Sequence, residues 1–118
     1  ANLWQAGLGN CKLIETNFES SNLSKAVLTD AIITKGIFNN AIMNHTDLTN
    51  ADLSCASLTD AQLQKAILFS VNLQGAILNR ADLSHAYLSG ANLTDSYLID
   101  TSFNGVDLDD IQISNIKT

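Results

Sequence analysis

Bulky apolar residues recur at every fifth position of this chain, from Leu3 to Ile113, without a change of phase. Seventeen members of the series are leucine. The others are Phe18, Ile33, Phe38, Met43, Phe103 and Ile113. A small residue lies two positions before each apolar residue, and between Ala1 and Thr101 it is alanine in 13 of 21 cases. Self-similarity at a short fixed period predicts a repeat architecture.

A period of five fits neither standard element. On an α-helix it would rotate the apolar residue by about 140° per repeat, and on a flat strand it would place successive apolar residues on opposite faces. The pattern works if the chain turns once per repeat. The small residue and the leucine then point inward from a short extended piece, and the residue between them points outward. The last two residues, such as Ser54-Cys55 and Gln74-Gly75, have turn chemistry, which predicts an all-β solenoid whose coils pair edge to edge.

The repeats at 51–55, 81–85 and 91–95 have the form Ala-Asp-Leu or Ala-Asn-Leu followed by two variable residues. Over its whole length the chain resembles the pentapeptide-repeat family, with its A-[D/N]-L-x-x motif. The resemblance implies a right-handed quadrilateral β-helix with four pentapeptides per coil, and 118 residues would then make almost six coils in one domain. Like residues 20 apart agree with this closure, as in Phe18/Phe38, Ile67/Tyr87 and Ile77/Tyr97.

The small series becomes bulky near the C-terminus, at Val106, Ile111 and Ile116. Such residues overfill an alanine slot, so we expect the regular β-helix to cover residues 1–110 and residues 111–118 to form an end or capping tail. Within the stack Val71 is the one oversized residue of the series, and we expect the wall to bulge around it.

Three isoleucines make the tail too apolar to trail in water: Ile111, Ile113 and Ile116. They are predicted either to cover the last leucine layer or to meet a second molecule in an end-to-end homodimer. A monomer with an intramolecular cap is favoured, because aspartates gather near this end and two such ends would repel. These aspartates are Asp95, Asp100, Asp107, Asp109 and Asp110.

The formal net charge of −6 argues against direct nucleic-acid binding, which needs a basic surface. No run of 18 apolar residues and no signal peptide is visible. We therefore expect a soluble protein without a membrane partner and favour the cytoplasm. Cys11 falls at an inward position and Cys55 at an outward turn in another coil, so we expect both to be unpaired.

The chain offers little for catalysis. Its carboxylates fall at motif positions or in bends, and a filled solenoid has no cleft where two would converge. His45 and His85 share a column but lie ~9.6 Å apart, too far for a common zinc ion. We therefore predict no enzyme activity, no metal and no cofactor. The column that contains them is a candidate basic stripe, either a solubilising surface or an anion- or partner-docking ridge: Lys25, His45, Lys65 and His85.

Apolar residues also occupy positions that should face outward. With 20 residues per coil, one candidate partner-binding patch contains Ile67, Phe69 and Tyr87, and a second, on the opposite face, contains Ile77, Tyr97 and Ile99. Such residues also suit strands and stack in ladders for structural reasons. An exposed cluster of them indicates an interaction site.

The sequence therefore favours a non-enzymatic protein-binding or scaffolding surface that contacts an unidentified protein partner. The family resemblance implies an alternative, because some members mimic a DNA duplex and inhibit a type II topoisomerase, gyrase. Here the carboxylates are spread over several columns and no loop interrupts the repeats. A purely structural module is the third interpretation.

Overall fold

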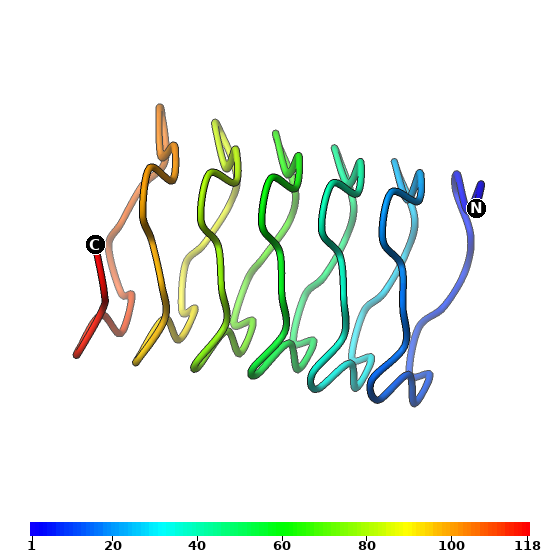
Figure 1. The fold of residues 1–118 in the computed structure, drawn as a ribbon, viewed down its shortest axis with the longest axis horizontal. Coiled ribbons are helices and arrows are strands. Elements are labelled where there is room, and N and C mark those ends of the chain that lie inside the picture. Colours follow the sequence, from blue (N-terminus) through cyan, green and yellow to red (C-terminus); the bar gives the residue numbers. More distant parts are fainter.

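The structure, a computed structural model, describes residues 1–118 and contains no α-helix and no continuous β-strand. Instead, the outward residue of each pentapeptide forms a parallel bridge with the residue 20 positions later. These bridges run from Asn2↔Asn22 to Tyr97↔Lys117, and in that series only the bridge from Tyr87 to Asp107 is missing. The coils stack along one axis with the termini at opposite ends (Figure 1), in a molecule of 32 × 23 × 21 Å. The prediction that residues 20 apart stack on one another is confirmed.

Each pentapeptide makes the same backbone hydrogen bonds. In the repeat at 51–55, the N–H of Leu53 donates to the Asn72 carbonyl at 2.8 Å, and the N–H of Cys55 donates to Gln74 at 2.8 Å. The N–H of Asn72 in turn donates to Ala51 at 3.0 Å. A further bond from Ala56 to Leu53 closes a β-turn. In the regular repeats the interior backbone is thus satisfied by one-residue bridges and turns alone. No helix long and apolar enough to cross a membrane is present.

The fifth residue of every pentapeptide, from Gln5 to Asn115, has a positive φ, near 60° for the non-glycine residues. Together with the turn bond from the small residue that follows it, this is the pattern of a type II turn. Only Gly75, Gly90 and Gly105 are glycines. At the other sites an L-residue holds the left-handed conformation at a cost of about 1–2 kcal/mol. The turn that ends every pentapeptide imposes it.

This conformation predicts that a β-branched side chain is poorly tolerated at the fifth position. Lys35 has φ 60° and an exposed side chain, and we expect Lys35→Val to lower the free energy of unfolding by about 1–3 kcal/mol. The matched control is Gln62→Val at an exposed outward position, which should change stability by less than about 0.5 kcal/mol. Urea denaturation measures both variants. Equal losses would contradict the assignment of the strain to the turn.

The interior is a continuous column of apolar side chains. The ten leucines from Leu48 to Leu93 are at most 1% exposed, and the alanines paired with them at most 4%. The predicted bulge at Val71 is wrong. Its carbonyl still accepts the Asn92 N–H at 2.9 Å, and the adjacent Asn72–Ala51 bond is intact. The ladder on both sides of Val71 therefore holds the wall in register.

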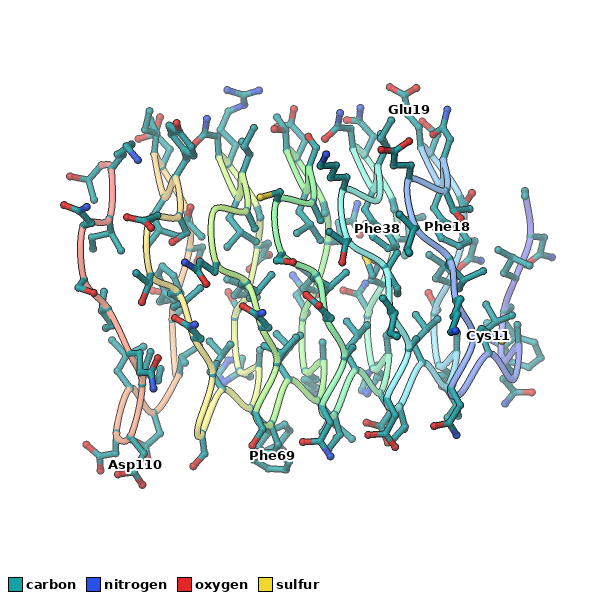
Figure 2. The ribbon with its side chains drawn as sticks, turned by 90° about the horizontal axis from the view of Figure 1, so that it is seen from below. Cys11, Phe18, Glu19, Phe38, Phe69 and Asp110 are labelled. Carbon is teal, nitrogen blue, oxygen red and sulfur yellow. The ribbon has the colours of Figure 1, made fainter.

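The interior is tightly packed around Phe38. Its ring stacks on that of Phe18, with centroids 5.0 Å apart and planes inclined by 14°, and both rings lie inside the rod (Figure 2). A Cβ atom added at Gly36 would lie 2.6 Å from Ile33 Cγ2 and 2.9 Å from Phe38 Cε2. Glycine therefore occupies this small position because the larger neighbours fill the space that an alanine needs.

Where a threonine or serine occupies the small position of a repeat, its hydroxyl can donate a hydrogen bond to a leucine carbonyl. The Thr46 hydroxyl donates to the Leu23 carbonyl at 2.9 Å, and the Ser96 hydroxyl donates to the Leu93 carbonyl at 2.7 Å. No buried side-chain nitrogen or oxygen lacks a partner. Hydroxyl residues can therefore replace alanine without an unpaired polar group in the core.

The Asp or Asn of the motif has a structural role. Its Oδ1 atom accepts the backbone N–H two residues later, as from Ser54 to Asp52 at 3.0 Å, which is an Asx-turn. Where the outward residue cannot do this, an asparagine in the preceding coil can substitute, as when Asn39 accepts the Thr59 N–H at 3.0 Å. The motif thus supplies an acceptor for the one N–H that faces outward at the turn.

The regular pairing is interrupted at a different place from the one predicted. It is lost at residues 107–110, directly after Val106, and then resumes: the Leu93 N–H donates to Gln112 at 2.8 Å and the Lys117 N–H donates to Ser96 at 2.8 Å. Residues 111–117 therefore continue the coil. Ile111 packs against the core, whereas Ile113 is 43% exposed. Whether Ile111, Ile113 and Ile116 serve as an end cover or a dimer contact stays a prediction.

Candidate protein-binding site

The surface has one cleft, with a volume of about 280 Å³. It lies where the ladder is interrupted. Residues 85–89 line it together with Phe69, Gly105 and Asp107. The cleft thus exists because the segment after Val106 does not pair with the coil before it.

Two exposed aromatic side chains line this cleft. Phe69 and Tyr87 are 41% and 52% exposed, and their ring centroids lie 5.8 Å apart with planes inclined by 50°. Ile67 is half-buried and bridges to Tyr87. Phe69 points away from the rod axis at the same edge as Asp110 (Figure 2). The structure therefore brings together Ile67, Phe69 and Tyr87, which we call the aromatic patch.

Backbone groups in the cleft are left without protein partners. In the preceding coil, Ala66 accepts from Tyr87 at 2.9 Å, Leu68 donates to Tyr87 at 2.7 Å and Ser70 donates to Ser89 at 2.9 Å. The equivalent carbonyl of Ala86 and the N–H groups of Leu88 and Gly90 make no such bonds. Ala86 and Leu88 are only 4% and 1% exposed, so the segment after Val106 covers these backbone groups without forming ladder bonds to them. Sequence reasoning missed this feature, because unpaired backbone groups have no side-chain signature.

His85 lies at the rim of the cleft, against the next coil. A Cβ atom at residue 105 would overlap its imidazole, so a larger residue there would require the His85 ring to move. Gly105 also has φ 70°, which favours glycine independently. His85 was predicted only as part of a basic stripe, and the structure adds its contact with the cleft.

The predicted basic stripe is a column in space. Lys25, His45, Lys65 and His85 are all exposed at the same turn of successive coils. Their backbone N–H groups donate to the next coil at 2.8 to 3.1 Å. The role of this stripe as a docking ridge stays a prediction.

The second predicted patch lies on a part of the surface without a cleft. Tyr97 and Ile99 are 36% and 44% exposed, and Ile77 is half-buried and bridges to Tyr97. Lys117 Nζ lies 4.6 Å from the centre of the Tyr97 ring, a cation–π contact. This contact already occupies one face of the Tyr97 ring.

The carboxylates form surface hydrogen bonds and do not converge. The hydrogen bond from the Ser84 hydroxyl lowers the pKa of Asp82; burial opposes this shift, and the weaker effect of the Gln64 amide adds to it. Arg80 lowers the pKa of Asp60 through two contacts of 2.9 and 3.0 Å. No three His, Cys, Asp or Glu side chains meet where a metal ion could bind. Both cysteines are free, as predicted.

The family profile described as "Pentapeptide repeats (8 copies)" matches residues 1–40, 38–68 and 66–105. The chain belongs to the pentapeptide-repeat family. Its fold is thus the right-handed β-helix of that family, and no catalytic family is indicated. No curated protein matches the sequence.

Three solved structures of pentapeptide-repeat proteins are similar to this chain. Rfr23 from the cyanobacterium Cyanothece 51142 is 30% identical over 94% of this chain and 86% of its own, with a TM-score of 0.55. A protein from Nostoc PCC 7120 is 31% identical over 95% and 84%, with a TM-score of 0.50. HetL from Nostoc sp. strain PCC 7120, described as involved in heterocyst differentiation regulation, is 28% identical over 95% and 61%, with a TM-score of 0.51.

Proposed function

We propose that this pentapeptide-repeat protein acts without catalysis, as a four-sided rod of almost six coils that binds a protein partner through the aromatic patch. The 20-residue register and the turn after every fifth residue support the four-sided description. The observation that carries the binding proposal is the pair of exposed aromatic rings, Phe69 and Tyr87, beside the cleft.

The patch has the properties of an interaction site. Tyrosine is enriched among the residues that dominate binding energy, because it offers a large, stiff, amphipathic surface. The backbone beneath Tyr87 is fixed by bonds to Ala66 and Leu68, so little conformational freedom is lost on binding. Because Phe69 and Tyr87 lie next to a cleft, a partner can also surround the two rings. A flat face of the rod would allow contact from one side only.

Capture of partners from an extract of the source organism tests this proposal, with Tyr87→Asp as the disrupting variant and Tyr97→Asp as the matched control on the opposite face. Both tyrosines are exposed, so both variants should melt like the wild type. We expect a partner held by the wild type to bind Tyr87→Asp at least about 30-fold more weakly, as for the loss of an interface hot spot. Its affinity for Tyr97→Asp should be unchanged.

The other outcomes distinguish rival sites. A partner lost only from Tyr97→Asp would transfer the function to the patch of Ile77, Tyr97 and Ile99. A partner retained by both variants, with an affinity that falls steeply with salt, would instead indicate the acidic end of the rod. Either result would overturn the assignment to the aromatic patch.

A further inference from the structure

We propose that the partner contributes an extended peptide strand, which lies in the cleft and pairs with the backbone of residues 86–90; this rests on the function proposed above. The carbonyl of Ala86 and the N–H groups of Leu88 and Gly90 have no protein partner. They are an acceptor and two donors in the order that every preceding coil uses to bind the next. An added strand is a known mode of peptide recognition at an open sheet edge.

The ladder determines how such a strand would run. All bridges in this fold are parallel, so the strand would run parallel to residues 86–90. One of its N–H groups would donate to Ala86, and two of its carbonyls would accept from Leu88 and Gly90. The residue that pairs with Tyr87 would point outward beside the Tyr87 ring, in the position that Ile67 holds in the preceding coil. Its two neighbours would point inward, which favours small and aliphatic side chains.

The acidic charge beside the cleft also restricts which apolar strands can bind. Asp107, Asp109 and Asp110 lie on the segment that borders the open side of the cleft and are all exposed. Between Arg80 and Lys117 the chain has no lysine or arginine. The partner strand is therefore expected to carry a lysine or arginine beside its apolar residues, since an acidic strand would be repelled.

The chain's own segment 107–110 is the competing occupant. Asp107 would make the missing bridge to Tyr87 if this segment moved onto the ladder. In the structure Asp107 makes no such bridge. Its carboxylate accepts the Asp109 N–H at 3.0 Å, as in the paired repeats, and Leu108 is 47% exposed. The experiment must therefore distinguish a peptide in the cleft from closure by residues 107–110.

The probe is a fluorescent synthetic peptide with the sequence of residues 64–71, blocked at both ends, added to the intact protein. This segment pairs with residues 86–90 from the opposite edge and contains Lys65 beside Ala66, Ile67 and Leu68. In the ladder, the N–H of the outward residue points to the preceding coil, and that of the following residue points to the next coil. N-methylation at Ile67 thus removes the donor to Ala86, whereas N-methylation at Leu68 is the matched control.

We expect the unmodified peptide and the peptide methylated at Leu68 to bind equally, and the peptide methylated at Ile67 to bind about tenfold more weakly. Equal binding by all three peptides, or no binding by any of them, would overturn the strand-pairing proposal. The protein-binding function would then still be decided separately, by the effect of Tyr87→Asp on the captured partner.

Amide hydrogen exchange provides the second measurement. In the free protein the Leu88 amide should exchange much faster than the amides of Leu83 and Leu93, which donate to Ser102 and Gln112 at 2.9 and 2.8 Å. The bound peptide should slow Leu88 exchange by about tenfold or more. If Leu88 is as protected as Leu83 without peptide, residues 107–110 fill the cleft themselves and the proposal is wrong.

Discussion

Leu73→Asp is expected to unfold the whole rod in one cooperative transition. Leu73 is 1% exposed and lies mid-stack between Leu53 and Leu93, which are equally buried. An aspartate there would bury a carboxylate with no partner, at a cost of more than about 4–5 kcal/mol. This is comparable to the total stability of a small domain, about 5–15 kcal/mol. Because each coil is held by its neighbours, a fault in the middle of the stack weakens both halves.

The control for this prediction lies one residue away. Asn72 is outward, and its Oδ1 atom accepts the Gln74 N–H at 3.0 Å. Asn72→Asp keeps that acceptor and reproduces Asp52, the residue in the same column one coil earlier. Circular dichroism melting should show a normal transition for Asn72→Asp and no folded baseline for Leu73→Asp. Similar melting of the two variants would contradict the packed interior.

Phe38→Ala is expected to produce the second largest loss, about 3–5 kcal/mol. Phe38 is fully buried, and its ring stacks on Phe18. The adjacent small position is Gly36, so no neighbouring methyl group is available to fill the space that the ring leaves. Leu58→Ala, in the same column beside Ala56, removes a smaller side chain next to an alanine and should cost less.

The role of Gly36 can be separated by a double-mutant cycle. Gly36→Ala alone should cost about 1–3 kcal/mol, because its Cβ would overlap Ile33 and the Phe38 ring. In a Phe38→Leu background the ring atom is gone, and the same substitution should cost less, although the contact with Ile33 remains. Guanidinium denaturation of the four proteins gives the coupling energy. Additive losses would show that Phe38 does not determine the glycine.

The inward and outward alternation could be predicted from the sequence because it depends on local chemistry. In Ala51-Asp52-Leu53, burial of the first and third side chains follows from their size and polarity, whatever the rest of the chain does. The period of five did not by itself predict that a coil contains 20 residues. That prediction rested on the family resemblance and on like pairs such as Phe18 and Phe38. Once closure was assumed, Ile67, Phe69 and Tyr87 could be placed on one face.

The left-handed backbone conformation at the turns could not be predicted from the sequence. Lys35 and Lys65 are residues that rarely adopt positive φ by themselves, and nothing in their identity indicates it. Both have φ near 60° because the coil must turn through a corner after every fifth residue while keeping its ladder bonds. The closure of the whole coil outweighs the local preference of these residues.

The cleft also depended on tertiary context. Val71 and Val106 are the same residue type at the same position of the repeat. The sequence therefore gives both the same expectation, but only Val106 is followed by lost pairing. The wall at Val71 pairs with coils on both sides, which hold it in place, whereas residues 107–110 lie in the last coil and make none of the ladder bonds to residues 86–90, although residues 112 and 117 of that coil stay paired. The repeat by itself determined which side chains are buried. Only the tertiary structure decided where the ladder is interrupted, because a segment of the last coil is held from one side alone and can leave the ladder while its neighbours in sequence stay paired.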